Sequence, residues 1–356
     1  MGADLDGGKG GGNAVRERRL PFVDALRGLA VAGMLVIHQS EWWLAPAARR
    51  TDGFALLYFF SKAVAPTFLT LVGVALVLRF QGRPPRRVHL HAVLRRGVKI
   101  LALGYLLNLA VWGPVWGIEE LACWDVLQLI GVALPVCALL LRLPWWARLT
   151  AAGGIVWLST RLTLRHLSSF PPYLADIVHG RTPPAYFPLV PWVVYPLAGT
   201  VLGEAYLTAR RAGRLSRFAA TVGAVGMALL LLGAAGRPWR VHFDPDELWL
   251  TEFSHPGLDQ LAFAGGVVLV LFAAFSKSHT QGCPMWTDPL VRMGQNSLFI
   301  YCLHHLVGYT LFYFLGWHNR FGSPAVAAML SISFVLTYIL LRALPGSLQR
   351  FRAALR

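Results

Sequence analysis

The chain is poor in charged residues. Asp, Glu, Lys and Arg make up 14% of its 356 residues, whereas 56% are hydrophobic. Soluble domains carry about 25% charged residues, so this chain has too few to cover a water-exposed surface. The same apolar content excludes a disordered or collagen-like chain. The four cysteines lack the spacing of a zinc site or a disulfide framework: Cys123, Cys137, Cys283 and Cys302. The composition therefore indicates a membrane protein with several spans.

Ten apolar stretches are each roughly 16–27 residues long, which is enough to cross a bilayer core of about 30 Å. Because lipid offers no partner for backbone N–H and C=O groups, we expect an all-α integral membrane fold. The stretches lie at 20–40, 54–80, 93–112, 121–141, 145–160, 186–208, 216–235, 257–275, 294–316 and 323–344. We expect a flexible basic tail at 1–19, a ten-helix transmembrane domain at 20–344 and a second basic tail at 345–356.

Acidic residues are scarcer still, with 17 against 33 basic ones and a net charge of +16. In a soluble protein this excess would suggest nucleic-acid binding. Here most of the basic residues fall in the segments that are cytoplasmic when the N-terminus is inside, and the acidic ones gather on the other side. This asymmetry predicts that both termini are cytoplasmic in a multi-pass protein of the cytoplasmic (inner) membrane, with no nucleic-acid partner.

The first stretch carries ionisable residues, and each costs about 2.5–3.5 kcal/mol near the bilayer centre. Asp24 and Arg27 are three residues apart and can pair on one helix face. Arg27 and His38 are eleven apart, about three turns, so they point the same way with a rise of roughly 16.5 Å. Arg27 can hold a phosphate, and His38 can deprotonate an acceptor or act as a nucleophile. The alternative is a snorkelling Arg paired with Asp, and an interfacial His.

The segment from Asp24 to His38 resembles the first helix of the heparan-α-glucosaminide N-acetyltransferase family, within the wider group of membrane sugar acyltransferases. Later pieces resemble further helices of that family in the expected order: 65–73, 125–131, 187–192 with Gly199 and Gly203, and 294–305. The resemblance implies a transmembrane acyltransferase that moves an acyl group, in the first place acetyl, from cytoplasmic acyl-CoA to an extracytoplasmic sugar or glycolipid. It also implies that His38 is catalytic. Lysosomal members carry Asn at this position, which weakens the expectation that glucosamine is the acceptor.

His304 and Asp125 are two further candidates for the catalytic site. His304 is followed directly by His305, and adjacent side chains on a helix point about 100° apart, so only one of the two histidines can easily face a shared cavity; we favour His304. The alternative is that His304 has no catalytic role and forms a hydrogen bond to a neighbouring helix. Asp125 is expected level with His38, where it can orient His38 or His304 as an imidazolium partner, unless it simply faces water.

Donor binding is assigned to residues expected near the cytoplasmic face. Asn296 and Ser297 open the penultimate stretch, and a dense basic run at 79–96 ends in Arg95 and Arg96. These arginines can bind the phosphates of acyl-CoA, although topology and anionic lipid also explain such a run. With Asp24 and Arg27 they complete the predicted donor-binding set.

The expected partners are acyl-CoA as co-substrate, a carbohydrate or lipid-linked glycan acceptor, and membrane lipids; a homodimer is compatible with the sequence. We expect no metal and no tightly bound cofactor. A glycolipid or acyl transporter (flippase) is the alternative function. It would predict matching inverted halves, which the sequence does not display. A non-catalytic scaffold would leave Asp24, Arg27 and His38 unexplained.

Overall fold

The computed structural model of the chain describes residues 20–162, 167, 169–180, 185–236, 256–280 and 288–354. In this part of the chain every element is a helix. The first eleven elements are α2 (Pro21–Trp43), α3 (Pro46–Arg49), α4 (Asp52–Ser61), α5 (Val64–Phe80), α6 (Arg87–Val111), α7 (Gly113–Trp116), the 3-10 helix η1 (Ile118–Ala122), α8 (Val126–Leu140), α9 (Trp145–Arg161), α10 (Pro172–His179) and α11 (Leu189–Trp192). They are followed by α12 (Val194–Arg211), α13 (Leu215–Ala235), α15 (Leu258–Thr280), α16 (Asp288–Gln295), α17 (Ser297–Leu303), the π-helix η4 (His304–Leu311), α18 (Phe312–Phe314), α19 (Ser323–Ala343) and α20 (Pro345–Ala354).

All ten apolar stretches contain helices, which confirms the all-α expectation. Seven helical segments among the described residues are long and apolar enough to cross a membrane: Pro21–Trp43, Asp52–Phe80, Arg87–Trp116, Leu215–Ala235, Leu258–Lys277, Ser297–Phe314 and Ser323–Ala343. The helix α8 is apolar but shorter, at Val126–Leu140. Ten spans and cytoplasmic termini therefore stay predictions. The predicted tail at 1–19 lies outside the described residues, and the segment expected as a second tail contains α20.

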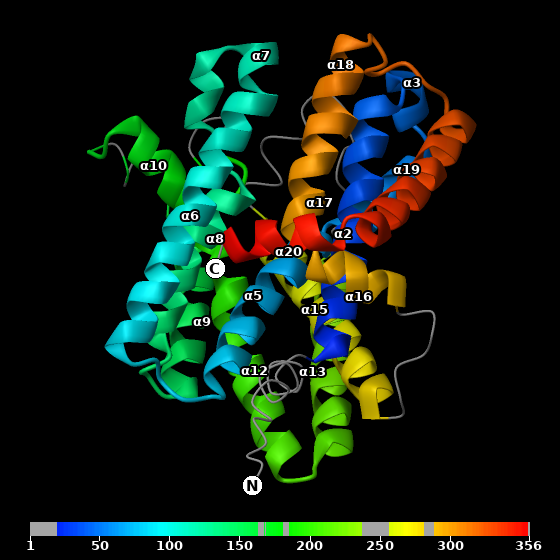
Figure 1. The fold of residues 1–356 in the computed structure, drawn as a ribbon. Helices are drawn as coiled ribbons and strands as arrows, with labels where there is room; N and C mark the ends of the chain where they lie inside the picture. Colours follow the sequence, from blue (N-terminus) through cyan, green and yellow to red (C-terminus); the bar gives the residue numbers. More distant parts are fainter. Residues whose placement is uncertain are drawn as a thin grey trace, which may run out of the picture.

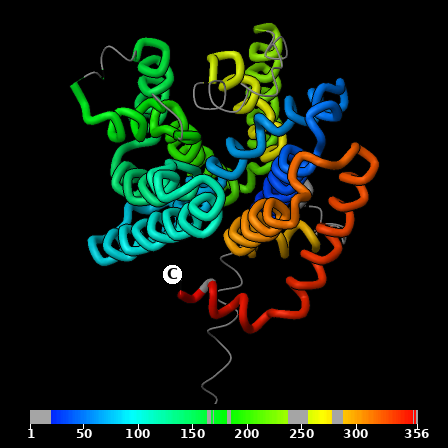
Figure 2. The backbone as a smooth tube through the Cα atoms, turned by 90° about the horizontal axis from the view of Figure 1, so that it is seen from above, coloured from blue at the N-terminus to red at the C-terminus, as the bar shows by residue number. Residues whose placement is uncertain are grey.

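Helix α2 holds the central position in the assembly. It packs against α4, α5, α15, α16, α17, η4 and α19. Helices α6, α8 and α9 form a group on the opposite side of α5, and α17–η4–α18 and α19 stand beside α2 (Figure 1). Seen along the perpendicular direction, α20 runs out from the end of α19 (Figure 2). The residues that the sequence places on α2 consequently face several neighbours at once.

Glycines allow the closest helix crossings. A Cβ on Gly28 of α2 would lie 1.9 Å from the Leu290 carbonyl oxygen of α16, and one on Gly294 of α16 would lie 1.8 Å from the Asp24 carbonyl oxygen. Without glycine at both positions the two backbones could not touch. Such small-residue contacts are the usual basis of helix packing in membranes, where dispersion rather than the hydrophobic effect holds helices together.

A buried ion pair joins α9 to α12. The Arg148 side chain, only 2% exposed, donates hydrogen bonds to Glu204 and, at 2.9 Å, to the Thr200 hydroxyl. In the sequence Arg148 falls within the apolar stretch at 145–160, and a single basic residue near the end of such a stretch looks the same whether it faces solvent or a neighbouring helix. Its position inside the assembly depends on the partner that α12 supplies.

We predict that Gly28→Ala destabilises the protein. The added methyl group must push α16 away from α2, and overpacking of this kind costs about 1–3 kcal/mol. Gly154→Ala is the matched control, because a Cβ there meets nothing within 4 Å on α9, and alanine is the better helix former by about 0.5–1 kcal/mol. Thermal unfolding of the detergent-purified variants measures both. Equal midpoints for the two variants would show that the α2–α16 contact tolerates a side chain.

Candidate functional site

A cavity of about 740 Å³ runs along one face of α2. Asp24 and Arg27 line it towards the start of the helix, and His38, Glu41 and Trp42 line it towards the end. The sequence predicted that Arg27 and His38 point the same way, and both do line this one cavity. Its other walls come from α4, α5, α6, α8 and the α16–α17 segment.

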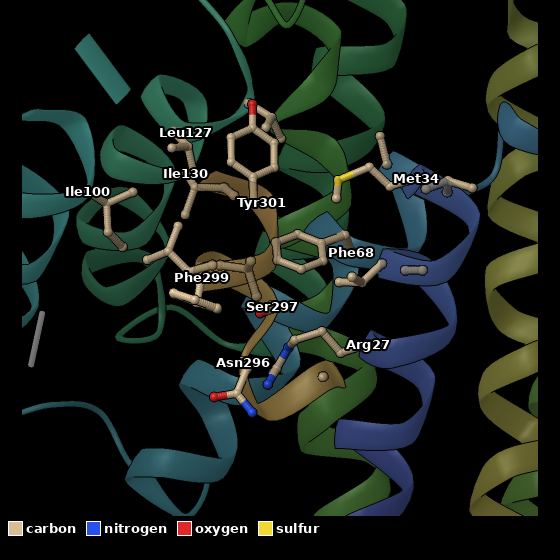
Figure 3. Close-up of a pocket in the computed structure, with 18 of the residues that line it drawn as sticks. Arg27, Met34, Phe68, Ile100, Leu127, Ile130, Asn296, Ser297, Phe299 and Tyr301 are labelled. Carbon is tan, nitrogen blue, oxygen red and sulfur yellow. The ribbon is translucent and has the colours of Figure 1, made fainter. Parts of the chain in front are cut away.

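The end of the cavity near Arg27 is polar. Arg27 pairs with Asp24 at 3.1 Å, and the Gln295 amide donates to the other Asp24 oxygen at 3.3 Å. The chain breaks between α16 and α17 at Asn296, and the Arg27 side chain extends towards Asn296 and Ser297 (Figure 3). Both residues line the cavity, as the donor-binding prediction requires.

Of the two arginines on α6 that were predicted to bind the donor, only one lines the cavity. Arg96 is among the residues that line the cavity and Arg95 is not, although both side chains are exposed. Both lie within α6 and not in a loop before it. Successive helical side chains differ by about 100°, so only one of the two can face the interior.

The middle of the cavity is apolar. Met34, Phe68, Ile100, Ile130 and Phe299 surround it from five different helices (Figure 3). An apolar passage between two polar ends fits an extended molecule with a charged head, a largely apolar arm and a reactive tip.

At the far end two histidines from distant parts of the chain meet. His38 Nδ1 lies 3.1 Å from His304 Nε2, and the two rings stack 5.4 Å apart. His304 Nδ1 lies 2.6 Å from the Tyr301 carbonyl oxygen and 3.2 Å from that of Ile300. Carbonyls only accept hydrogen bonds, so Nδ1 of His304 must carry the proton.

These contacts settle the protonation pattern of the neutral pair. With its proton on Nδ1, His304 can only accept through Nε2, so His38 must donate from its own Nδ1. The lone pair of His38 then lies on Nε2. His38 lines the cavity, and its Nε2 has no hydrogen-bond partner in the part of the chain that the structure describes. A cavity-lining imidazole with a free, oriented lone pair can act as a base or a nucleophile.

Of the adjacent pair, His305 lines the cavity and His304, which the sequence favoured, does not, although His304 contacts His38. Both His304 and His305 are buried, and their ring centroids lie 5.4 and 5.9 Å from that of His38. Helix α17 changes into the π-helix η4 at His304, and the wider π turn reduces the angle between successive side chains. Trp43 of α2 donates to the Gly308 carbonyl at 2.8 Å and holds this turn. Such π turns often occur at functional sites.

Asp125 takes a different place from the one proposed for it. Its Oδ1 accepts from the Val126 N–H at 2.7 Å and caps α8, and its Oδ2 accepts from the Tyr301 hydroxyl at 2.7 Å. Asp125 lines the cavity, but its described hydrogen bonds do not include either histidine. It therefore acts on the histidines only through Tyr301, whose ring lies 4.8 Å from His305.

The model of the catalytic domain of heparan-α-glucosaminide N-acetyltransferase matches residues 19–235. This is more than half of the chain. The chain belongs to this family. A search among curated proteins gives no match. Arg27, His38 and Asp125 lie inside the matched region, whereas the histidines of η4 lie beyond it.

For this family member, sequence reasoning missed two residues of the site. Glu41 was counted with the acidic residues outside the membrane, but it is buried and lines the cavity. A signal existed, because Glu41 follows His38 by three residues and so shares its helix face. Tyr186 also lines the cavity. Its phenol hydroxyl can donate a hydrogen bond to a bound molecule.

The three histidines also form the one described group that could hold a metal ion. The ligand atoms of His38, His304 and His305 lie within 4.8 Å of one another. Zinc–nitrogen bonds of 2.0–2.1 Å place the nitrogens of two ligands about 3.4 Å apart in a tetrahedral site. The His38–His304 contact, at 3.1 Å, is shorter than this and is an ordinary hydrogen bond with a consistent proton assignment. A hydrogen bond between the two histidines therefore explains their contact without a metal ion.

We predict that Asp125→Asn keeps the fold and that Asp125→Ala does not keep it fully. Asn caps a helix about as well as Asp, whereas Ala at a cap costs about 0.5–2 kcal/mol, and Ala also removes the acceptor for Tyr301. Thermal unfolding compares the two variants. If Asp125→Asn unfolds at as low a temperature as Asp125→Ala, the negative charge itself holds the site together.

Proposed function

We propose that the chain is a membrane acetyltransferase that takes acetyl-CoA at the Arg27 end of the cavity and transfers the acetyl group at His38 to a sugar or glycolipid. Membership of the family supports acetyl transfer. The observation that carries the assignment of ends is the cavity itself, in which α2 presents Arg27 and His38 at opposite ends of one apolar passage.

The donor would bind with its phosphates at the end lined by Arg27, Arg96 and Asn296. Guanidinium groups bind phosphate through paired, charge-assisted hydrogen bonds. From there the pantetheine arm would follow the apolar walls, because Arg27 and His38 are separated by roughly 16.5 Å along the helix. The thioester would then reach the lone pair of His38. With the N-terminus of α2 in the cytoplasm, the donor enters from that side and the acceptor from the other.

At the far end His38 Nε2 would take the proton of the acceptor group as that group attacks the thioester carbonyl. The carbon–sulfur bond breaks, and the departing CoA thiolate takes the proton back from the imidazolium, which restores neutral His38. His304 acts through His38, because its Nε2 holds the Nδ1–H of His38 and so keeps the reactive lone pair on Nε2. His304 is thus a positioning residue, which the Tyr301 carbonyl orients in turn.

We predict that His38→Ala abolishes acetyl transfer and leaves donor binding intact. General base catalysis contributes about 10²–10⁴ in rate. Radiolabelled acetyl-CoA with an envelope glycan extract measures transfer, and CoA binding is measured in parallel. Wild-type protein that releases no CoA and labels no product would sink the proposed function.

His304→Ala should lower kcat about 10- to 150-fold, because a hydrogen bond to a charged group contributes about 1.5–3 kcal/mol, and should leave the donor KM nearly unchanged. His304→Gln supplies an amide oxygen near the position of Nε2 and should restore part of kcat. Equal activity of the Ala and Gln variants would contradict the positioning role.

We also predict that Arg96→Ala weakens CoA binding about three- to tenfold, which corresponds to about 0.7–1.4 kcal/mol for a solvent-accessible phosphate contact. Arg95→Ala is the matched control, because it removes the same charge from the same helix at a position that does not line the cavity. The measurement is the dissociation constant of 3′,5′-ADP and of CoA for each purified variant. Equal weakening by both variants would mean that the basic run acts only through its overall charge.

A further inference from the structure

His305 has an unusual environment for a buried imidazole. Its side chain is 4% exposed and lines the cavity, yet neither ring nitrogen has a hydrogen-bond partner among the described residues. Aromatic rings surround it, with centroids at 4.8 Å for Tyr301, 5.3 Å for Trp42 and 5.7 Å for Trp112. Buried polar groups in native proteins are almost always satisfied by protein, water or ligand. Two unsatisfied nitrogens facing a cavity therefore indicate that a bound molecule completes them.

Glu41 presents the same feature on the opposing helix. It lies one turn beyond His38 on α2, is 6% exposed and lines the cavity, and its Oε2 has no hydrogen-bond partner in the part of the chain that the structure describes. A carboxylate accepts hydrogen bonds and cannot donate them when ionised. Trp42 follows Glu41 on α2 and also lines the cavity, and its ring centroid lies 5.3 Å from that of His305 and 5.4 Å from that of His38. Polar groups beside an aromatic ring in one cavity are components of a sugar-binding site.

We infer that Glu41 and His305, with the ring of Trp42, form the acceptor subsite, and that the acceptor is a neutral sugar which presents a hydroxyl group to His38. The inference rests on the proposed function, since it names the substrate class of the same site. Acetyl transfer then forms an ester: the hydroxyl proton goes to His38 Nε2, the oxygen bonds to the acetyl carbon, and CoA leaves as the thiol after taking that proton.

The chemistry of the subsite favours a hydroxyl over an amine. A neutral imidazole offers one donor and one acceptor, and sugar hydroxyls both donate and accept, so they can satisfy His305 as well as Glu41. An amine arrives as an ammonium ion, which only donates and must lose a proton before it can attack.

The test measures binding and transfer separately in protein reconstituted in nanodiscs. The probes are alkyl glucosides, galactosides and mannosides, and the 2-amino-2-deoxy glucoside of the same chain length. Binding is followed by tryptophan fluorescence, and transfer by labelled acetyl-CoA. His305→Gln and Glu41→Gln should each weaken binding of the neutral glycosides at least tenfold and leave CoA binding within twofold. Glu119→Gln, an exposed residue away from the cavity, is the matched control, and thermal midpoints verify folding.

Several results would overturn the inference. These are unchanged glycoside binding in both variants, acetylation of the amino glycoside with none of the neutral ones, or a stoichiometric transition metal that His305→Gln removes. Because binding is measured without the donor, loss of sugar binding in the variants would support the subsite even if no acetyl transfer occurred. Absence of transfer in the wild type would instead count against the proposed function.

Discussion

Backbone contact between α2 and α16 at Gly28 and Gly294 determines the position of almost everything in the site. Because the two helices touch there, Gln295 reaches Asp24 and fixes the acid that holds Arg27. The chain then breaks at Asn296 and continues as α17 beside α2, which brings His304 to His38. One close helix crossing thus positions both ends of the cavity. A side chain at either glycine would separate the helices and change both ends together.

The cavity joins two environments with opposite physical requirements. A donor that carries phosphates needs a positively charged side chain in its binding site, and a charged side chain is costly in the middle of the membrane. Arg27 lies at one end of the cavity, where it pairs with Asp24, which also accepts a hydrogen bond from Gln295. The proposed acetyl transfer needs a base within the helical assembly, for which we propose the imidazole of His38. The backbone carbonyl of Tyr301 orients His304, and His304 orients His38, so neutral groups direct the lone pair of His38.

The first helix was the part of the site that sequence reasoning could predict. Helical periodicity is a local property, so the eleven-residue spacing of Arg27 and His38 places both on one face wherever the helix lies. The same reasoning favoured His304, whereas His305 is the one of the pair that lines the cavity, in a segment where the chain forms a π-helix. It also did not place Glu41 in the cavity or Arg148 against α12, since whether a charged residue near a helix end is solvated or buried depends on the neighbouring helix. Asp125 was expected beside a histidine and instead caps α8 and accepts from Tyr301.

The amino-acid sequence by itself determined the class of the molecule and its first catalytic candidate. Scarcity of charge and long apolar stretches require membrane helices, and the spacing on α2 requires Arg27 and His38 to face the same way. Only the tertiary structure decided which residues meet them: His304 and not Asp125 at His38, Arg96 and not Arg95 at the cavity, and Glu41 with His305 around its far end. The physical reason is that hydrogen bonds and burial arise between helices far apart in the chain. Their register depends on close crossings that no local pattern specifies.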